Sequence, residues 1–443
     1  MSNTNPAAAF AGIWKTPELK SKIGFTLLAL LVYRIGGHIT APGIDVNALV
    51  AFFQNTKGGA PLLGLYDLFV GGGLSRATVF ALGIVPYISA SIVFQIVGAV
   101  VPTVENMQRE EEGRKRITQW TRYLTVGVAV LQATGYTQFT MGQAGAVLNP
   151  TFGFQMQMVL FLTAGAVFVM WLGEQITERG IGNGASLLIF FSIVERIWPS
   201  IGQTYGFIAT GAIKLVQLFA LALIMVAVVG FTVAITVAAR RVPIQIPQRT
   251  MARGRQRESA KNFIPLRLNA ANVMPIIFAQ TVVVVPGLLA QVFKFAWLQA
   301  MVEYLQPGTV WYFLLEALLI LFFTYFYTAI IFNPVDIAEN LKKQGAFIPG
   351  VKPGAKTAEY IERIVTRITL PGAIFLTAVA LLPIVISDAI NVPFRFGGTS
   401  LLIVVGVGLD TLAQLQQHLL LRKYDTFMKK GRVRFRGRAA TGF

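Results

Sequence analysis

The sequence predicts an all-α membrane protein, and three observations support this fold class. Apolar residues make up 54% of the chain and charged residues only 13%, and the mean hydropathy is positive. This composition is too apolar for a soluble protein of this size. Many apolar stretches approach the roughly 20 residues that a helix needs to cross a bilayer. They are also too long and unbroken for the alternating strands of a membrane barrel.

Ten apolar segments are candidates for membrane-spanning helices. In chain order they are Ile23 to Ile39, Ala77 to Val101, Arg122 to Ala133, Phe154 to Leu172, Ile181 to Trp198, Ala212 to Ala238, Val273 to Phe293, Val310 to Phe332, Ile368 to Ile386, and Thr399 to Leu421. The third is the weakest, because it reaches a spanning length only with flanking polar residues out to Gln119 and Gln138. Residues 1–22 show no apolar core or cleavage-site pattern, so the first segment is expected to be an anchor.

Lysines and arginines gather in a few loops, which predicts the orientation of the chain. Loop 239–269 and the tail 422–443 hold eight each, and the net charge of the chain is +18. Because positive loops stay in the cytosol, we expect both segments, loop 333–367 and both termini to be cytoplasmic. Cysteine is absent, which excludes disulfides and thiolate metal sites.

The ten segments divide into five plus five at residues 199–211. The division predicts an N-terminal half of residues 23–198 and a C-terminal half of residues 212–421. An odd number of spans in each half gives the two halves opposite topology, and a cavity between such halves is a recurring membrane design.

The segment Pro61 to Gly73 is apolar but short, contains Asp67 and ends in three glycines. A half-length helix at membrane depth is tolerated only within protein or beside a cavity. The residues alone leave two interpretations open, an interfacial loop and a movable stopper hinged at Gly71 to Gly73.

No motif predicts an enzyme, a metal site or a cofactor site. The stretch GVKPGAKT at 350–357 lacks the glycine that directly precedes the lysine of a phosphate loop. The stretch GIGNG at 180–184 lacks the strand and the acidic partner of a dinucleotide site. His38 and His418 are far apart with no carboxylate motif nearby, and no nucleophile and base pairing is discernible.

The residues so far leave open an ion-coupled secondary transporter and an insertase or scaffold without a conducting path. A transporter needs ionisable groups near the middle of the membrane. The candidates are Glu316 and Asp410. Glu316 lies roughly 9 Å from the start of its span, within reach of the interface if the helix tilts.

Four motifs then point to a family. They are GGGLSRATVFALGIVPYISASI from Gly71, WLGEQITERGIGNG at 171–184, FNPVDIAENLKKQGAFIPG at 332–350, and VPFRFGGTSLLIVV at 392–405. With these motifs in this order, the chain resembles the SecY family, the channel subunits of the bacterial protein-translocation complex, from about Glu18 to past Leu420. The resemblance implies two inverted five-helix halves that form a clamshell, with an hourglass pore, a lateral gate toward lipid and a short plug helix. It implies a channel that passes unfolded secretory polypeptides and releases hydrophobic segments sideways into lipid.

The resemblance also assigns a pore and a plug. The pore ring falls on Ile84, Ile88, Ala185, Ile189, Ile277 and Ile403. A ring of aliphatic carbon blocks ions by dewetting, yet it deforms around a passing chain. Ala185 departs from the family's usual bulky residue, so the ring is either wider there or closed by Leu188. The plug falls on Leu62, Leu63, Leu65, Tyr66, Asp67, Leu68, Phe69, Gly71, Gly72 and Gly73.

The family's lateral gate lies between the second and seventh spans. Here the predicted gate residues are Tyr87, Ser89, Gln95, Asn272 and Gln280. Clustered Lys and Arg bind polyanions by phosphate neutralisation, although such loops also serve topology alone. The resemblance implies ribosome or SecA contacts at Arg253, Arg255, Arg257 and Lys352. Lys352 stands where the family commonly has arginine, so a point charge replaces a bidentate grip.

The resemblance implies a set of partners and a location. SecE is expected as the clamp around both halves and SecG as an accessory subunit. The SecA ATPase or a ribosome, bound through its rRNA, is expected as the motor. Signal sequences, translocating polypeptides, membrane lipid and possible SecD/SecF or YidC accessories complete the set. The location is the bacterial inner membrane, with several crossings and both termini cytoplasmic.

Overall fold

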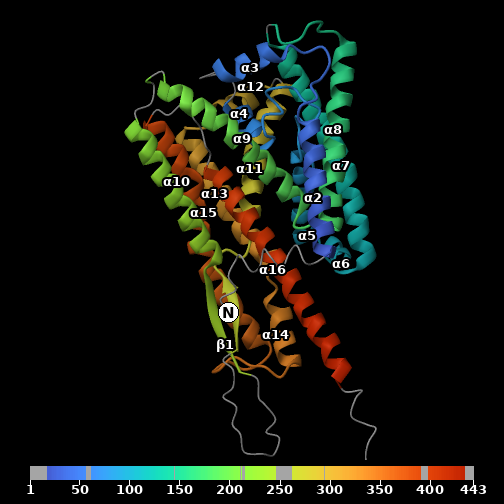
Figure 1. Cartoon of the computed structure of the whole chain (residues 1–443), viewed down its shortest axis with the longest axis vertical. Helices are drawn as coiled ribbons and strands as arrows, with labels where there is room; N and C mark the ends of the chain where they lie inside the picture. Colours follow the sequence, from blue (N-terminus) through green and yellow to red (C-terminus); the bar gives the residue numbers. More distant parts are fainter. Residues whose placement is uncertain are drawn as a thin grey trace, which may run out of the picture.

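The computed structural model describes residues 17–55, 61–143, 145–209, 211, 215–245, 262–293, 295–390 and 398–434. It is a helical bundle from which a small two-stranded sheet projects at one end (Figure 1). The helices are α2 (Pro17–Gly36), α3 (Val46–Asn55), α4 (Pro61–Phe69), α5 (Val85–Val100), α6 (Pro102–Arg109), α7 (Glu111–Met141), α8 (Phe152–Arg179), α9 (Gly184–Ala209), α10 (Leu215–Val237), α11 (Met274–Val292), α12 (Ala296–Tyr304), α13 (Val310–Ile331), α14 (Pro334–Lys343), α15 (Ala355–Ile390) and α16 (Gly398–Arg434). Strands β1 (Ala239–Ile244) and β2 (Asn262–Arg267) pair antiparallel.

Each predicted span overlaps one helix, namely α2, α5, α7, α8, α9, α10, α11, α13, α15 or α16. Within the described residues, four helical stretches are long and apolar enough by themselves to cross a membrane. A fifth candidate is the α5–α6 pair, which bends by 107°. The weak third span becomes the 31-residue helix α7. Its Thr121, Thr125, Ala129 and Gln132 are buried, so their poor hydropathy reflects packing against protein and not against lipid.

The helix ends differ from the predicted segment bounds at three places. The second span begins at Val85 and not at Ala77, because residues 77–84 form turns with positive φ at Ala77 and Gly83. The expected connecting loop 199–211 is largely a continuation of α9 through Pro199 to Ala209. The expected tail begins as helix, because α16 runs on to Arg434.

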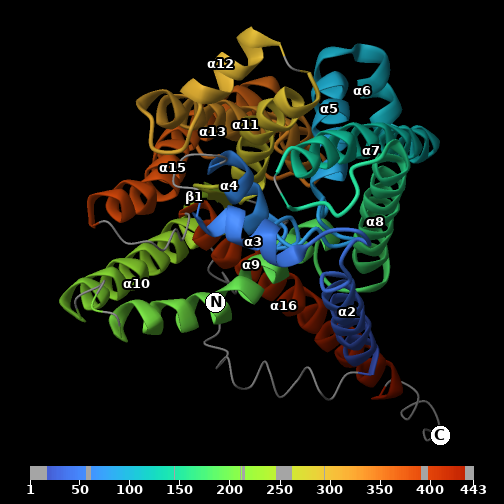
Figure 2. The same ribbon diagram turned by 90° about the horizontal axis from the view of Figure 1, so that it is seen from above.

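Viewed from above, the helices form two groups (Figure 2). Helices α2, α5, α6, α7 and α8 lie on one side, whereas α10, α13 and α15 lie on the other. Helices α9 and α16 pass between the groups and pack against each other. The short helix α4 lies near the centre and contacts α9 and α11.

The β1–β2 hairpin and the 333–367 segment meet in one small folded unit that the sequence did not predict. Buried residues of the hairpin, Val242 and Leu266, pack with Leu341, Ile348 and Ile361 of the 333–367 segment and α15. A backbone pair between Gln245 and Phe347 closes the junction. The exposed arginines of the hairpin therefore stand on an apolar base.

Candidate functional site

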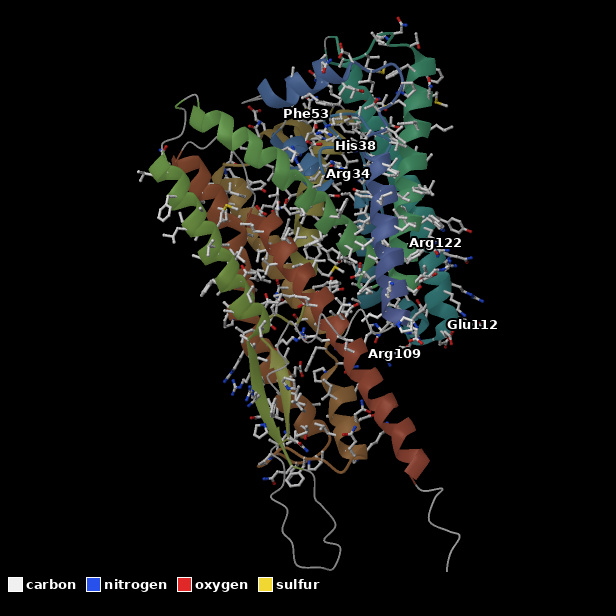
Figure 3. The ribbon with its side chains drawn as sticks, in the orientation of Figure 1. Arg34, His38, Phe53, Arg109, Glu112 and Arg122 are labelled. Carbon is white, nitrogen blue, oxygen red and sulfur yellow. The ribbon has the colours of Figure 1, made fainter. Side chains whose placement is uncertain are left out.

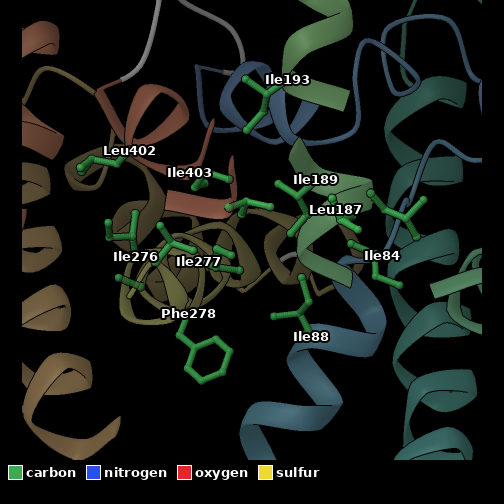
Figure 4. Packing of buried hydrophobic residues seen from close by; sticks show 14 of the residues in the cluster. Ile84, Ile88, Leu187, Ile189, Ile193, Ile276, Ile277, Phe278, Leu402 and Ile403 are labelled. Atoms are coloured by element: carbon green, nitrogen blue, oxygen red, sulfur yellow. The ribbon is translucent and has the colours of Figure 1, made fainter. Parts of the chain in front are cut away.

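The predicted ring residues converge at the boundary between the two groups of helices. Ile84, Ile88, Ile189, Ile277 and Ile403 belong to one buried hydrophobic cluster (Figure 4). They come from the start of α5 and from α9, α11 and α16, and their exposed fractions range from 0 to 6%. Ile84 and Ile88 lie one helical turn apart, so both side chains reach the same face.

A cavity of about 280 Å³ adjoins this cluster. Ile88, Ile189 and Ile277 form an apolar part of its wall, while Gln95, Asn183 and an ion pair form a polar part. In that pair Arg122 (Figure 3) donates from Nε and a terminal nitrogen to both carboxylate oxygens of Glu174, each at 2.9 Å. The wall of the cavity is therefore polar on one part and aliphatic on another.

Ala185 faces the cavity, whereas Leu188 does not line it. Leu188 is 1% exposed and turned toward Gly173 of α8, where the side chain of Ile84 also packs. Residues three apart on a helix point only about 60° apart, so Ala185 and Leu188 lie on the same side of α9, with Leu188 directed toward α8. Because Leu188 does not line the cavity, its packing gives no support to closure of the ring by Leu188, and a ring that is wider beside Ala185 stays a prediction.

The predicted plug is a short helix whose single acid is buried and paired. Asp67 is 3% exposed and accepts a 2.8 Å hydrogen bond from Arg196 of α9. Its other oxygen accepts the Ser75 backbone N–H at 2.9 Å. Tyr66 donates to the Leu82 carbonyl, and Leu63 is buried beside it. The side chains of Leu62, Leu65 and Leu68 lie outside the described part.

The glycines after the plug helix allow a close approach to α9. Gly71 and Gly72 have φ of +73° and +85°, a region that favours glycine. A Cβ on Gly71 would lie 3.2 Å from the Ser192 carbonyl oxygen. Phe69 packs against the same cluster as the ring, so the plug and the ring share a boundary.

Helix α9 sets the order of these parts. Ala185 and Ser186 line the cavity, Ile189 lies in the ring, Ser192 touches Gly71, and Arg196 holds Asp67. From Ala185 to Arg196 the helix rises roughly 16 Å. Cavity, constriction and plug are therefore stacked along one helix.

The predicted gate residues divide into two sets. Helices α5 and α11 pack directly against each other. Tyr87 and Gln95 line the cavity, and Gln95 donates to Ser91. Ser89 is half-buried on α5 and does not line it. Asn272 donates to Asp410 of α16 at 3.0 Å, and Gln280 donates to Glu316 of α13.

The structure changes the interpretation of the two deep acids. Glu316 has no exposed surface and faces α11 from α13, so its expected position within reach of the membrane interface stays a prediction. Asp410 is half-buried and bonded to Asn272. Each carboxylate bonds a side chain next to or on α11, which makes both acids links between helices.

Of the four predicted partner contacts, the structure describes Lys352. Lys352 is exposed on the turn before α15, and its carbonyl accepts the Thr357 hydroxyl. Arg253, Arg255 and Arg257 lie outside the described residues.

Sequence reasoning missed two charged residues of α9, Arg196 and Glu195. Glu195 forms an ion pair with Arg34 of α2. Charges inside an apolar span are a signal of function, and both residues fall within the predicted fifth span.

A helical bundle in which a buried isoleucine cluster adjoins a partly polar cavity on one side and a short helix on the other has the parts expected of a gated channel. The comparisons agree. A family model described as SecY matches residues 78–412. The protein translocase subunit SecY of Pseudomonas aeruginosa is 44% identical over 423 residues, which cover 94% of this chain and 95% of the relative. The chain therefore belongs to the SecY family.

Two solved structures are similar in fold. One concerns the plug domain of SecY, described as stabilising the closed state of the translocation channel. It has a TM-score of 0.65 and 16% identity, and the match covers 90% of this chain and 92% of that one. The other is Sec61 in the canine ribosome-channel complex, with a TM-score of 0.59, 16% identity and the same coverage.

Proposed function

We propose that this chain is the central protein-conducting channel of a Sec translocon. It passes unfolded secretory polypeptides across the membrane and releases hydrophobic segments sideways into lipid. It acts as a passive path and not as an enzyme, so a motor or the membrane potential supplies the energy. Its place is the bacterial inner membrane, with both termini in the cytoplasm.

The stacking of cavity, ring and plug along α9 carries this proposal. A polypeptide entering the cavity meets Gln95, Asn183 and the Arg122–Glu174 pair. These polar side chains can form hydrogen bonds with its backbone. It then meets five isoleucines from four chain segments, which offer no hydrogen bonds to ions or water. Aliphatic side chains shift rotamers at little cost, so the ring fits around chains of any sequence.

The lateral gate is assigned to the α5–α11 boundary. Tyr87 and Gln95 on α5, with Met274 and Ile277 on α11, line the cavity from the two sides of that boundary. Parting the two helices would open the cavity toward lipid. Asn272 and Gln280 then serve the gate indirectly, because they tie α11 to α16 and α13.

The partners proposed are SecE as clamp, SecG as accessory subunit, and SecA or a ribosome as motor. Support for a ribosome is the similarity to Sec61, which was solved in a ribosome-channel complex. The unit built from the hairpin and the 333–367 segment holds Lys352, Arg240 and Arg241 exposed, and it adjoins Arg253, Arg255 and Arg257 in the sequence. A basic surface of this kind suits rRNA or an acidic protein face.

Replacing Ile84 and Ile88 by serine tests the ring. Hydroxyl groups hydrate the constriction, so we expect the resting ion conductance of planar bilayers to rise. Val93→Ser is the matched control, because Val93 is on the same helix but 47% exposed on its outer face. Unchanged conductance in Ile84→Ser/Ile88→Ser, with translocation intact, would contradict the ring.

A further inference from the structure

Helix α12 has three distinct faces, although it is only nine residues long. Leu298, Val302 and Leu305 form a face that packs on the protein. Gln299 and Glu303 form an exposed polar face. Trp297, Met301 and Tyr304 are spaced by four and three residues, so they form a third face. At about 100° per residue this third face lies roughly opposite the polar one.

This third face is apolar, aromatic and uncovered. Trp297 is 66% exposed, Tyr304 65% and Met301 39%. The rings of Phe293, Phe295 and Trp297 stack in sequence, with centroids 6.0 and 6.3 Å apart. We call Phe293, Phe295, Trp297, Met301 and Tyr304 the aromatic stripe. It begins one residue after α11 ends.

The aromatic stripe is followed along the chain by a spanning helix with an exposed apolar side. Val310, Trp311, Leu314 and Leu318 of α13 are each more than half exposed, and α13 is apolar enough to cross the membrane. An apolar helix face exposed at that depth is suited to contact with lipid. Figures 1 and 2 place α12 at the end of the bundle away from the hairpin, beside α11 and α13.

We propose that the aromatic stripe binds the lipid headgroup interface on the side of the membrane opposite the basic loops. Tryptophan and tyrosine favour that zone because they join an apolar ring to a polar tip. The polar face then points to water while Leu298 packs inward, as expected of a helix lying in the plane of the interface. The place of α12 in the chain, between the apolar helices α11 and α13, favours lipid over a second protein. The inference rests on the proposed membrane function.

The consequence concerns the gate. Helix α12 follows α11 and packs against it, so the interface holds the end of α11 that lies away from the basic loops. A movement of α11 therefore has to tilt the stripe within the interface or move it along the interface.

The absence of cysteine from the chain permits a clean test. Single variants Met301→Cys, Glu303→Cys and Leu318→Cys of the full chain are labelled with a nitroxide and reconstituted into phosphatidylcholine vesicles. Collision with oxygen, which concentrates in lipid, is compared with collision with a water-soluble nickel chelate. All three positions are exposed, so the substitutions leave packing intact, and monodisperse elution in detergent checks folding.

We expect oxygen collisions to dominate at Met301→Cys and nickel collisions at Glu303→Cys, two residues away. Leu318→Cys reports the span itself and should resemble Met301→Cys at greater depth. Nickel collisions at Met301→Cys equal to those at Glu303→Cys would place the stripe in water and overturn the inference. Protection from both reagents would mean that a protein covers the stripe, which overturns the inference equally. If either of these results occurs while oxygen collisions dominate at Leu318→Cys, only the inference about the stripe fails and the proposed channel function stands. If nickel collisions dominate at Leu318→Cys, the assignment of α13 as a membrane span fails as well.

Discussion

Asp67 and Arg196 form a residue pair that ties the short helix α4, the proposed plug, to α9. The carboxylate is buried in α4 and bonded to a guanidinium on α9 and to the Ser75 backbone. The sequence indicated Asp67, because an acid in a short apolar helix is unusual. It did not indicate the partner, since 129 residues separate the pair and no spacing rule connects them.

Replacing Asp67 by asparagine should loosen the plug. The amide oxygen still accepts from Ser75, but the charge opposite Arg196 is lost, which costs about 1–3 kcal/mol. We expect a higher resting ion conductance in planar bilayers, and we expect residues of α4 to react faster with reagents added from outside. Arg196→Gln should have a similar effect, and the double variant should be less severe than the sum of the two. Additive effects would mean that the two side chains act separately.

At the scale of elements, the predictable parts are those that repeat a period or a length. The bounds of helices such as α10, α11 and α13 were predicted within a few residues, because an apolar run of about 20 residues indicates a membrane-spanning helix. The hairpin was missed, because loop 239–269 was assigned from its charge alone. Its alternation of exposed and buried residues, from Arg241 and Val242 to Pro265 and Leu266, is too short to separate from a loop.

The hairpin depends on its buried face. Val242→Asp places an unpaired carboxylate against Leu341 and Ile361, and the cost of several kcal/mol should detach the strands from α14 and α15. Limited proteolysis should then cut within residues 239–267 while the membrane helices stay protected. Arg240→Asp, at an exposed neighbouring position, is the control and should leave the cleavage pattern unchanged. Resistance of Val242→Asp would mean that the hairpin folds without this base.

At the scale of the whole molecule, family resemblance supplied what physical periodicity could not. Ten spans and a basic side followed from composition and charge, but the meeting of Ile84, Ile189, Ile277 and Ile403 did not. An isoleucine in a membrane helix carries no mark that separates a pore position from a packing position. Ala185 shows the remaining limit, since only the structure shows which way Leu188 points.

The chain has a net charge of +18, and loop 239–269 is proposed to use part of this charge to bind a ribosome or SecA. Changing Arg253, Arg255 and Arg257 to glutamine should weaken ribosome or SecA binding and flatten its dependence on salt, because fewer counterions are released. Affinity is measured across a salt series with the chain in vesicles. The triple change of Arg114, Lys115 and Arg116, exposed at the start of α7, removes equal charge and should have a smaller effect. Equal losses would assign the effect to net charge alone.

The arrangement along α9 has a mechanical consequence. The stretch from Ala185 to Arg196 is unbroken helix, with its proline further on at Pro199, so it turns as one lever. A rotation that swings Ile189 out of the waist also carries Arg196 away from Asp67. In the proposed channel, one rotation of α9 would therefore both enlarge the gap between the ring isoleucines and free α4 from its ion pair.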